Sequence, residues 1–200
     1  MPELKQYRWP REYNVIPQDV FFREDVYQLE LQRVFGGEDW HPVAHRAEIP
    51  KPGDFKLATI GEAPLLVVHS DDGAIRVFYN SCAHRGTQLK ICPRGKATEI
   101  ECPYHRWLFN LRGELVGAPG ISDFSPSFKK ADFGLRELRS GEVSGLVLAT
   151  KSVAGISLDD FLGEAKNFIA LVMGSEPLAL LGYHKVAYSG NWKEYGDNEG

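Results

Sequence analysis

Apolar positions near the N-terminus repeat with the period of a helix. Between residues 25 and 35 they fall on one helical face, and they are Tyr27, Leu31, Val34 and Phe35. Gly36-Gly37 follow directly, and they predict that the helix ends there in a left-handed conformation. We therefore expect residues 1–39 to form an N-terminal arm with one short helix.

The pattern changes from Trp40 onward to short apolar runs separated by turn signals, which is typical of a small antiparallel β domain. The predicted strands are Phe55–Ile60, Leu65–Ser70, Ile75–Tyr79, Ile100–Glu101, Trp107–Leu111, Leu115–Val116, Leu135–Leu138 and Gly145–Thr150. Asp71-Asp72-Gly73 and Arg112-Gly113 are turn signals, and the polar stretch 122–132 predicts a surface loop. This domain is predicted to span residues 40–150.

Residues 151–200 predict helices followed by a strand. Ser157 precedes an acidic first turn and predicts a capped helix, which Ala165–Val172 extends or repeats. The run Tyr183–Tyr188 predicts a strand, for which the remaining residues offer no obvious partner. We therefore expect residues 151–200 to begin a second domain that continues past Gly200. The predicted fold class is α+β.

Composition and charge narrow the range of functions. The 200 residues carry 23 basic and 27 acidic side chains, and no cluster of Lys and Arg forms a stripe that could contact a run of phosphates, so nucleic acid is not an expected partner. No apolar run approaches the roughly 20 residues of a membrane span, and no secretory signal is visible, so the expected location is the cytoplasm. Only three cysteines occur, which is an odd number, and cytoplasmic thiols are kept reduced, so a disulfide framework is not expected.

Two short segments each combine one Cys with one His. They are Cys82-Ala83-His84 and Cys102-Pro103-Tyr104-His105, with 17 residues between His84 and Cys102. Two thiolates and two imidazoles fit either a Zn²⁺ ion or a [2Fe–2S] cluster in which Cys₂ holds one iron and His₂ the other. A zinc finger usually places its two Cys together and its two His together, whereas each segment here has one of each, which favours the cluster.

These residues closely resemble the Rieske [2Fe–2S] domain through Cys-x-His-x₁₇-Cys-x₂-His, with Arg85-Gly86 after the first His and Trp107 near the second. The positions Gly53-Asp54-Phe55, Asn80, Leu89 and Gly113-x-Leu115 follow the same pattern. The resemblance covers roughly residues 40–150 and implies that Cys82, His84, Cys102 and His105 hold the cluster.

Within the Rieske family, the resemblance points to oxygenases. The respiratory-complex group adds a cysteine to each loop, but those positions are Thr87 and Tyr104 here. Residues 191–198 resemble the Asn-Trp-Lys-x-x-x-[Glu/Asp]-Asn signature that opens the catalytic domain of Rieske non-haem iron oxygenase large subunits of the aromatic-ring-hydroxylating type. That resemblance implies a mononuclear Fe(II) whose ligands are expected beyond residue 200, with Asn198 as a neighbour of the ligands and no catalytic residue within 1–200.

The resemblance also implies partners and properties. A reductase or ferredoxin would supply electrons for O₂-dependent hydroxylation, dihydroxylation or demethylation of a small organic, typically aromatic, substrate. A homotrimer is implied because the cluster then passes its electron to a neighbouring subunit, and a small beta subunit is an additional option. Trp107 replaces a Ser that donates to a bridging sulfide in high-potential relatives, so a low potential is predicted. Arg106 stands where the family more often has Gly, which predicts no tight backbone requirement there.

Two alternatives remain open beside the oxygenase. The chain could be a ferredoxin-like electron carrier without oxygenase chemistry, or a zinc-stabilised β module used for binding. Cys92 has no partner in the pattern, and it is expected to be a structural or loop residue.

Overall fold

The chain folds into short antiparallel strands with few helices, as a computed structural model of residues 10–12, 15–187 and 189–197 shows. The strands are β1 (His41–His45), β2 (Asp54–Ile60), β3 (Ala63–His69), β4 (Ile75–Tyr79), β5 (Arg94–Lys96), β6 (Ile100–Glu101), β7 (Leu108–Phe109), β8 (Leu115–Gly117), β9 (Arg139–Val143) and β10 (Leu146–Thr150). The α-helices are α1 (Glu24–Arg33), α2 (Leu158–Leu162), α3 (Ala165–Met173) and α4 (Trp192–Asp197). The 3₁₀ turns are η1 (Gln18–Phe21), η2 (Arg46–Glu48), η3 (Ile121–Asp123) and η4 (Lys130–Phe133). The predicted α+β class with an antiparallel β domain is confirmed.

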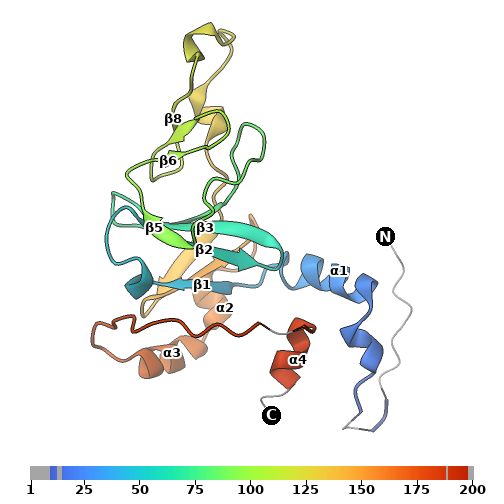
Figure 1. The fold of residues 1–200 in the computed structure, drawn as a ribbon. Coiled ribbons are helices and arrows are strands. Elements are labelled where there is room, and N and C mark those ends of the chain that lie inside the picture. Colours follow the sequence, from blue (N-terminus) through green and yellow to red (C-terminus); the bar gives the residue numbers. More distant parts are fainter. Residues whose placement is uncertain (1–9, 13–14, 188, 198–200) are drawn as a thin grey trace.

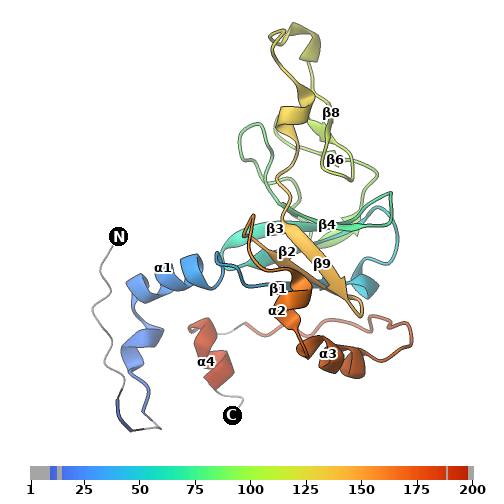
Figure 2. The same cartoon turned by 180° about the vertical axis from the view of Figure 1, so that it is seen from behind.

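The strands form three sheets arranged one above another. The four-stranded sheet, in the order β4-β3-β2-β5, lies in the middle (Figure 1). The small sheet β6-β7-β8 lies above it, and the sheet β1-β10-β9 lies below it, next to α2 and α3. Seen from behind, β4 and β9 lie side by side (Figure 2). The middle sheet therefore connects the other two.

Strand β3 is buried on both faces, which explains its continuous apolar sequence. Leu66 and Val68 pack into the upper core, whereas Leu65 and Val67 pack into the lower core. Successive strand residues point to opposite faces, so one strand serves both cores. Burying each such side chain contributes about 1.5–3 kcal/mol, and β3 therefore holds the two halves of the domain together.

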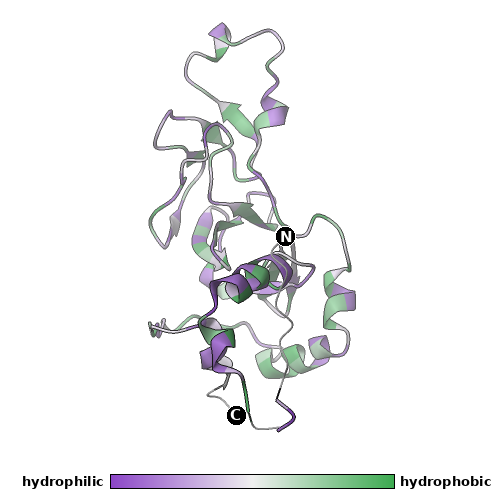
Figure 3. Ribbon diagram, turned by 90° about the vertical axis from the view of Figure 1, so that its right-hand side faces the viewer, coloured by the Kyte–Doolittle hydropathy of each residue, from purple (hydrophilic) through white to green (hydrophobic). Residues whose placement is uncertain are grey.

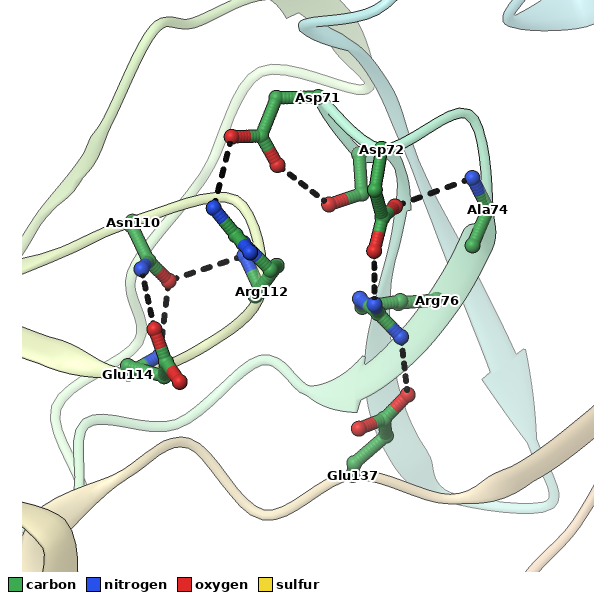
Figure 4. Close-up of polar contacts among 9 residues, drawn as sticks. Asp71, Asp72, Ala74, Arg76, Asn110, Arg112, Glu114 and Glu137 are labelled. Carbon is green, nitrogen blue, oxygen red and sulfur yellow. Dashed lines mark hydrogen bonds and ion pairs between the residues drawn. The ribbon is translucent and has the colours of Figure 1, made fainter.

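Two turns form a polar contact between the middle and upper sheets. Asp71, in the β3–β4 turn, receives a contact of 3.3 Å from the guanidinium of Arg112, in the β7–β8 turn (Figure 4). The Asn110 side-chain oxygen accepts from the backbone N–H groups of Arg112 and Glu114, each at 3.0 Å, and shapes the second turn. Exposed ion pairs contribute about 0–1 kcal/mol, so this contact orients the turns more than it stabilises them.

The prediction of a strand at Leu135–Leu138 is wrong. Leu135 and Leu138 are buried, but this segment forms only an isolated bridge between Glu137 and Phe78. The strand begins at Arg139, where five residues of β9 pair with β10. Leu135 and Leu138 are therefore apolar because they are buried in the core, and not because they belong to a strand. Strand β9 forms through its pairing with β10, which its mixed polar and apolar sequence does not predict. Strands β1 and β5 were not predicted. Strand β1 contains a proline and two histidines, and β5 is the exposed sequence Arg-Gly-Lys, so neither shows the apolar pattern of a strand.

The helices confirm the predicted positions but correct one helix end. The Ser157 side chain accepts from the backbone N–H of Asp160, as expected for a capping residue. At the end of α1, however, the capping residue Val34 is right-handed, and neither Gly36 nor Gly37 has a positive φ. A Cβ atom at Gly36 would lie 2.8 Å from a carbonyl oxygen of the last helical turn. These glycines therefore allow close packing against the helix rather than a left-handed turn.

The strand predicted at 183–188 is also not observed. Residues 183–187 form no strand, and Tyr188 lies outside the residues that the structure describes. Helix α4 begins at Trp192, so Asn191–Lys193 lead into a helix. The Trp192 indole N–H donates to Glu30 of α1 at 2.8 Å, and the Lys193 ammonium contacts the same carboxylate at 2.7 Å. The start of the oxygenase-like signature is therefore attached to the N-terminal arm. Asn198 lies outside the described residues.

Helix α3 presents an apolar face to solvent. Its ribbon is coloured largely apolar in Figure 3, and Phe168, Leu171 and Val172 are each more than two-thirds exposed. No helix in the described ranges is both long and apolar enough to cross a membrane.

A substitution at Gly113 tests how closely the β7–β8 turn packs against the middle sheet. Its φ is +82°, and a Cβ there would lie 2.6 Å from the ring of buried Phe78. We expect Gly113→Ala to lower the free energy of unfolding by about 2–4 kcal/mol, from overpacking and left-handed strain together. The control Gly73→Ala has a φ of +85° but no neighbour within 4 Å, so we expect a loss of only about 1 kcal/mol. Urea unfolding measures both, and equal losses would contradict the packing explanation.

Candidate metal centre

The first Cys-His segment lies in the loop between β4 and β5. The backbone N–H of Cys82 donates to the carbonyl of Thr87 at 2.8 Å, and the N–H of Gly86 donates back to the carbonyl of Cys82 at 2.8 Å. Gly86 has a φ of +73°, a left-handed conformation that glycine adopts without strain. These bonds close a tight loop in which His84 lies at the tip.

The second segment, between β6 and β7, has the same backbone pattern. The N–H of Cys102 donates to the carbonyl of Trp107 at 2.8 Å, and the N–H of Arg106 donates back to the carbonyl of Cys102 at 3.0 Å. Arg106 has a φ of +56°, so the expectation of no tight backbone requirement at this position is wrong. The turn demands the left-handed conformation at the residue that corresponds to Gly86, and Arg106 adopts it despite its side chain.

Asn80 holds the base of the first loop, a role that the sequence did not reveal. Its buried side-chain oxygen accepts from the backbone N–H groups of Leu89 (3.2 Å) and Lys90 (3.0 Å). Its amide donates to the carbonyl of Lys90 at 2.7 Å. Asn80 therefore joins the entry and the exit of the loop. The motif pattern singled out the position, but only the fold shows which backbone groups it reaches.

The structure brings the four predicted residues together as two pairs. The thiols of Cys82 and Cys102 are buried next to each other. The imidazoles of His84 and His105 are half-buried, with ring centroids 4.8 Å apart. The sulfur pair therefore lies inside and the imidazole pair lies at the surface.

This arrangement bears on the choice between zinc and an iron–sulfur cluster. Across the residues that the structure describes, no group of three or more His, Cys, Asp or Glu side chains is placed to hold a single ion. A structural Zn²⁺ needs four ligands at about 2.0–2.3 Å. A two-iron cluster instead needs a thiolate pair at one metal and an imidazole pair at the other. The pairwise arrangement fits the cluster.

A buried nitrogen supports the same fit. The Nδ1 atom of His105 is buried and has no hydrogen-bond partner among the described atoms. A buried polar atom without a partner costs about 1–3 kcal/mol, so it calls for an explanation. A metal bond at Nδ1 would satisfy this atom, and the half-exposed ring would remain accessible at its other nitrogen.

The electrostatic surroundings act in opposite directions on the two kinds of ligand. Burial raises the pKa of the Cys82 thiol, and the adjacent Cys102 thiol adds to the rise. Backbone N–H groups of His84 and Arg85 act against this rise, because they donate toward the sulfur. Burial also lowers the pKa of His84, and the positive charge of Arg85 adds to the effect. Both effects favour the neutral imidazole, the form that binds a metal.

Aromatic rings cover the imidazole side. Trp107 is buried and stacks on His84, with ring centroids 4.6 Å apart and an interplanar angle of 3°. Phe133 lies edge-on against Trp107 at 5.6 Å, and this ring cluster extends into the loop that precedes β9. Tyr104 is exposed, but its ring centroid lies 3.8 Å from that of His105. Trp107 therefore shields the imidazole side of the site, whereas Tyr104 covers it only in part.

Other candidates do not join the site. Cys92 is exposed and free, as expected for a loop residue. The buried imidazole of His69 is hydrogen-bonded to the carbonyl of Ile49 at 2.8 Å, which is a structural role.

Comparisons with known proteins agree with this geometry. A family model described as the Rieske [2Fe–2S] domain matches residues 39–132. The large subunit of anthranilate 1,2-dioxygenase from Burkholderia cepacia is 37% identical over 190 residues, which cover 92% of this chain and 45% of that protein.

Solved structures show the same fold. Naphthalene 1,2-dioxygenase from Rhodococcus sp., bound to indole, superposes with a TM-score of 0.74 and 33% identity, over 78% of this chain and 36% of the other. A quaternary ammonium Rieske monooxygenase, described in terms of carnitine oxidation and inter-subunit electron transfer, gives a TM-score of 0.68 and 29% identity, over 74% and 40% of the two chains. The chain thus spans less than half the length of these relatives.

Asn80 provides a test of how the first loop is held. Asn80→Ala would leave the buried backbone N–H of Leu89 and the part-buried N–H of Lys90 without their partner, whereas the Lys90 carbonyl would keep a bond from the Gln88 amide. We therefore expect the free energy of unfolding to fall by about 2–4 kcal/mol. As a control, Asn110→Ala removes bonds in the more exposed β7–β8 turn and should cost about 1 kcal/mol. Thermal unfolding followed by circular dichroism compares the two. Equal losses would show that Asn80 has no special role.

Proposed function

The chain belongs to the Rieske oxygenase large-subunit family, with its Rieske [2Fe–2S] domain at residues 39–132, and from this premise we propose that it is the electron-accepting portion of an oxygenase component. In this proposal, the cluster would carry electrons from a reductase or ferredoxin toward a mononuclear non-haem iron. That iron, when bound, would supply the O₂ chemistry for hydroxylation, dihydroxylation or demethylation of a small organic substrate. The separation of the buried thiol pair from the half-exposed imidazole pair is the observation that carries the proposal.

We assign the cluster ligands accordingly. Cys82 and Cys102 would hold the inner iron, and His84 and His105 would hold the outer iron. When bound, the cluster supplies a one-electron carrier whose potential is raised by the neutral imidazoles. The chain's own contribution is to hold those imidazoles half-exposed while Trp107 keeps water from one ring face.

We further propose that residues 151–200 begin the catalytic domain and that the ligands of the mononuclear iron lie beyond residue 200. The exposed apolar face of α3 supports this, because such a face is usually covered by more protein. The attachment of α4 to Glu30 supports it as well, because it fixes the direction in which the chain leaves the Rieske domain. Asn198 would then lie near the iron ligands.

The remaining partners are inferred at the level of the family. The anthranilate and naphthalene dioxygenases are named for aromatic substrates, which supports an aromatic substrate here. The description of inter-subunit electron transfer in the related monooxygenase supports a homotrimer in which one subunit's cluster serves its neighbour. A cytoplasmic location completes the proposal, and a small beta subunit is an additional option. The ferredoxin-like alternative is not favoured, because the matches to oxygenase subunits extend well beyond the Rieske domain.

Metal and sulfide analysis tests the cluster itself. We expect about two acid-labile sulfides per chain, iron at no less than that amount, and no stoichiometric zinc. Bound zinc without sulfide would instead establish the β module as a zinc-binding domain.

Replacing one imidazole tests the ligand assignment. We expect the unmodified protein to show a midpoint potential in the lower part of the roughly −150 to +300 mV Rieske range, because Trp107 offers no hydroxyl to the cluster. His84→Cys should lower the potential markedly and abolish the Rieske-type electron paramagnetic resonance spectrum, because a thiolate brings negative charge to the outer iron. The exposed His184 provides the control His184→Cys, which should change neither quantity. An unchanged spectrum in the first variant would refute the assignment.

A further inference from the structure

A small pocket reaches the cluster site from the cysteine side. Its volume is about 240 Å³, and its lining residues are Tyr79, Ser81, Cys82, Ala83, Gly134 and Arg136. Cys82 is otherwise buried, with 3% of its surface exposed. The pocket therefore provides a short approach to one proposed ligand of the inner iron, separate from the half-exposed imidazoles.

The rim of this pocket is basic. The Arg136 guanidinium lies 3.6 Å from the ring centroid of Tyr79, the last residue of β4. A second pocket of about 410 Å³ shares Tyr79 and Arg136 and adds the cations of Arg139 and Lys151. Both pockets are lined by Tyr79 of β4, and the second is also lined by Arg139 of β9. These two strands run side by side (Figure 2). We call the surface formed by Tyr79, Arg136, Arg139 and Lys151 the basic face.

The charges of the basic face are not neutralised within the described chain. Glu137 also lines the second pocket, but its carboxylate lies 3.7 Å from the Arg76 guanidinium (Figure 4). Arg139 donates to the carbonyls of Ala154 and Ile156 rather than to an acid.

Arg136 and Lys151 repel each other. Neither forms an ion pair with a carboxylate among the described residues. Burial lowers the pKa of Lys151, and the positive charge of Arg136 lowers it further. A net charge of −4 for the whole chain makes this local excess of cations stand out. Carboxylates from outside would relieve the repulsion.

We propose that the basic face docks an acidic electron-donor protein and that the electron enters the cluster on the Cys82 side. This inference rests on the proposed function. In the step, the donor's reduced [2Fe–2S] cluster loses one electron and the Rieske cluster gains it, with no bond made or broken. The half-exposed imidazoles of His84 and His105 remain available for transfer to the next acceptor. Entry and exit then use different sides of one site.

The test uses a plant-type [2Fe–2S] ferredoxin, an acidic protein whose reduction potential lies below the Rieske range, so that it can reduce a Rieske cluster. The holoprotein is compared with the double variant Arg136→Glu/Lys151→Glu. Two measurements are made at low ionic strength. Calorimetry determines the Kd for the oxidised ferredoxin, and stopped-flow absorbance determines the second-order rate constant for cluster reduction by the photoreduced ferredoxin.

A matched control comes from the opposite edge of the middle sheet. Lys96 lies in β5, on the far side from β4, and Lys51 is an exposed loop residue. Lys51→Glu/Lys96→Glu changes the net charge by the same amount away from the basic face. Arg136→Gln/Lys151→Gln removes the charges without reversing them.

We expect the Arg136→Glu/Lys151→Glu variant to raise the Kd and lower the rate constant at least about 10-fold, because charge complementarity steers association. The Gln variant should lie between it and the unmodified protein, the Lys51/Lys96 control should stay within about threefold, and added salt should shrink all differences. Three results would overturn the proposal. The Lys51/Lys96 control could change the Kd and the rate constant as much as the Arg136/Lys151 variants do, the Arg136/Lys151 variants could leave both unchanged, or the unmodified protein could fail to bind the ferredoxin.

The cluster's own spectrum separates this inference from the proposed function. All variants should keep the Rieske-type electron paramagnetic resonance spectrum after reduction by dithionite. A protein that shows this spectrum but fails the docking test contradicts only the basic face. A protein without it contradicts the proposed function itself.

Discussion

Two thiols and two imidazoles have to meet at one point, with the sulfur atoms inside and the rings near the surface. Burial disfavours the charged form of the Cys82 thiol, although a metal needs the thiolate. Backbone N–H groups directed at the sulfur offset part of that cost, and a bound metal would offset the rest. The two loops must therefore be rigid before the site can form. Their matching backbone hydrogen bonds provide this rigidity, even where Arg106 has to adopt a left-handed conformation.

The rest of the fold keeps these loops in register. Strand β3 buries side chains on both faces and thus joins the upper core, which contains the cysteines, to the lower core beneath the middle sheet. Asn80 closes the base of the first loop, and Gly113 lets the β7–β8 turn rest directly on Phe78. The contributions differ in kind, because apolar burial provides stability whereas the buried amide and the glycine determine position.

The surroundings of the site are asymmetric. Aromatic rings and half-exposed imidazoles lie on one side, and on the other side cations without an ion-pair partner among the described residues lie beside the pocket that reaches Cys82. An electron carrier that must accept from one protein and deliver to another site benefits from such a difference, because each partner can then bind by its own chemistry. The attachment of α4 to Glu30 adds a fixed connection from the N-terminal arm to the segment that follows the Rieske domain.

The sequence by itself determined the candidate ligand residues, their spacing and most of the strands, because these follow from local patterns within a few residues. It identified Cys82, His84, Cys102 and His105 as candidates and the Rieske family as the context. Tertiary structure alone decided which side of the site each pair occupies, that Leu135–Leu138 is buried without being a strand, and that Asn80 holds a loop. The cations of the basic face come from separate segments that only folding brings together. Burial, pairing and charge proximity depend on residues distant in the chain, so no local pattern could have shown them.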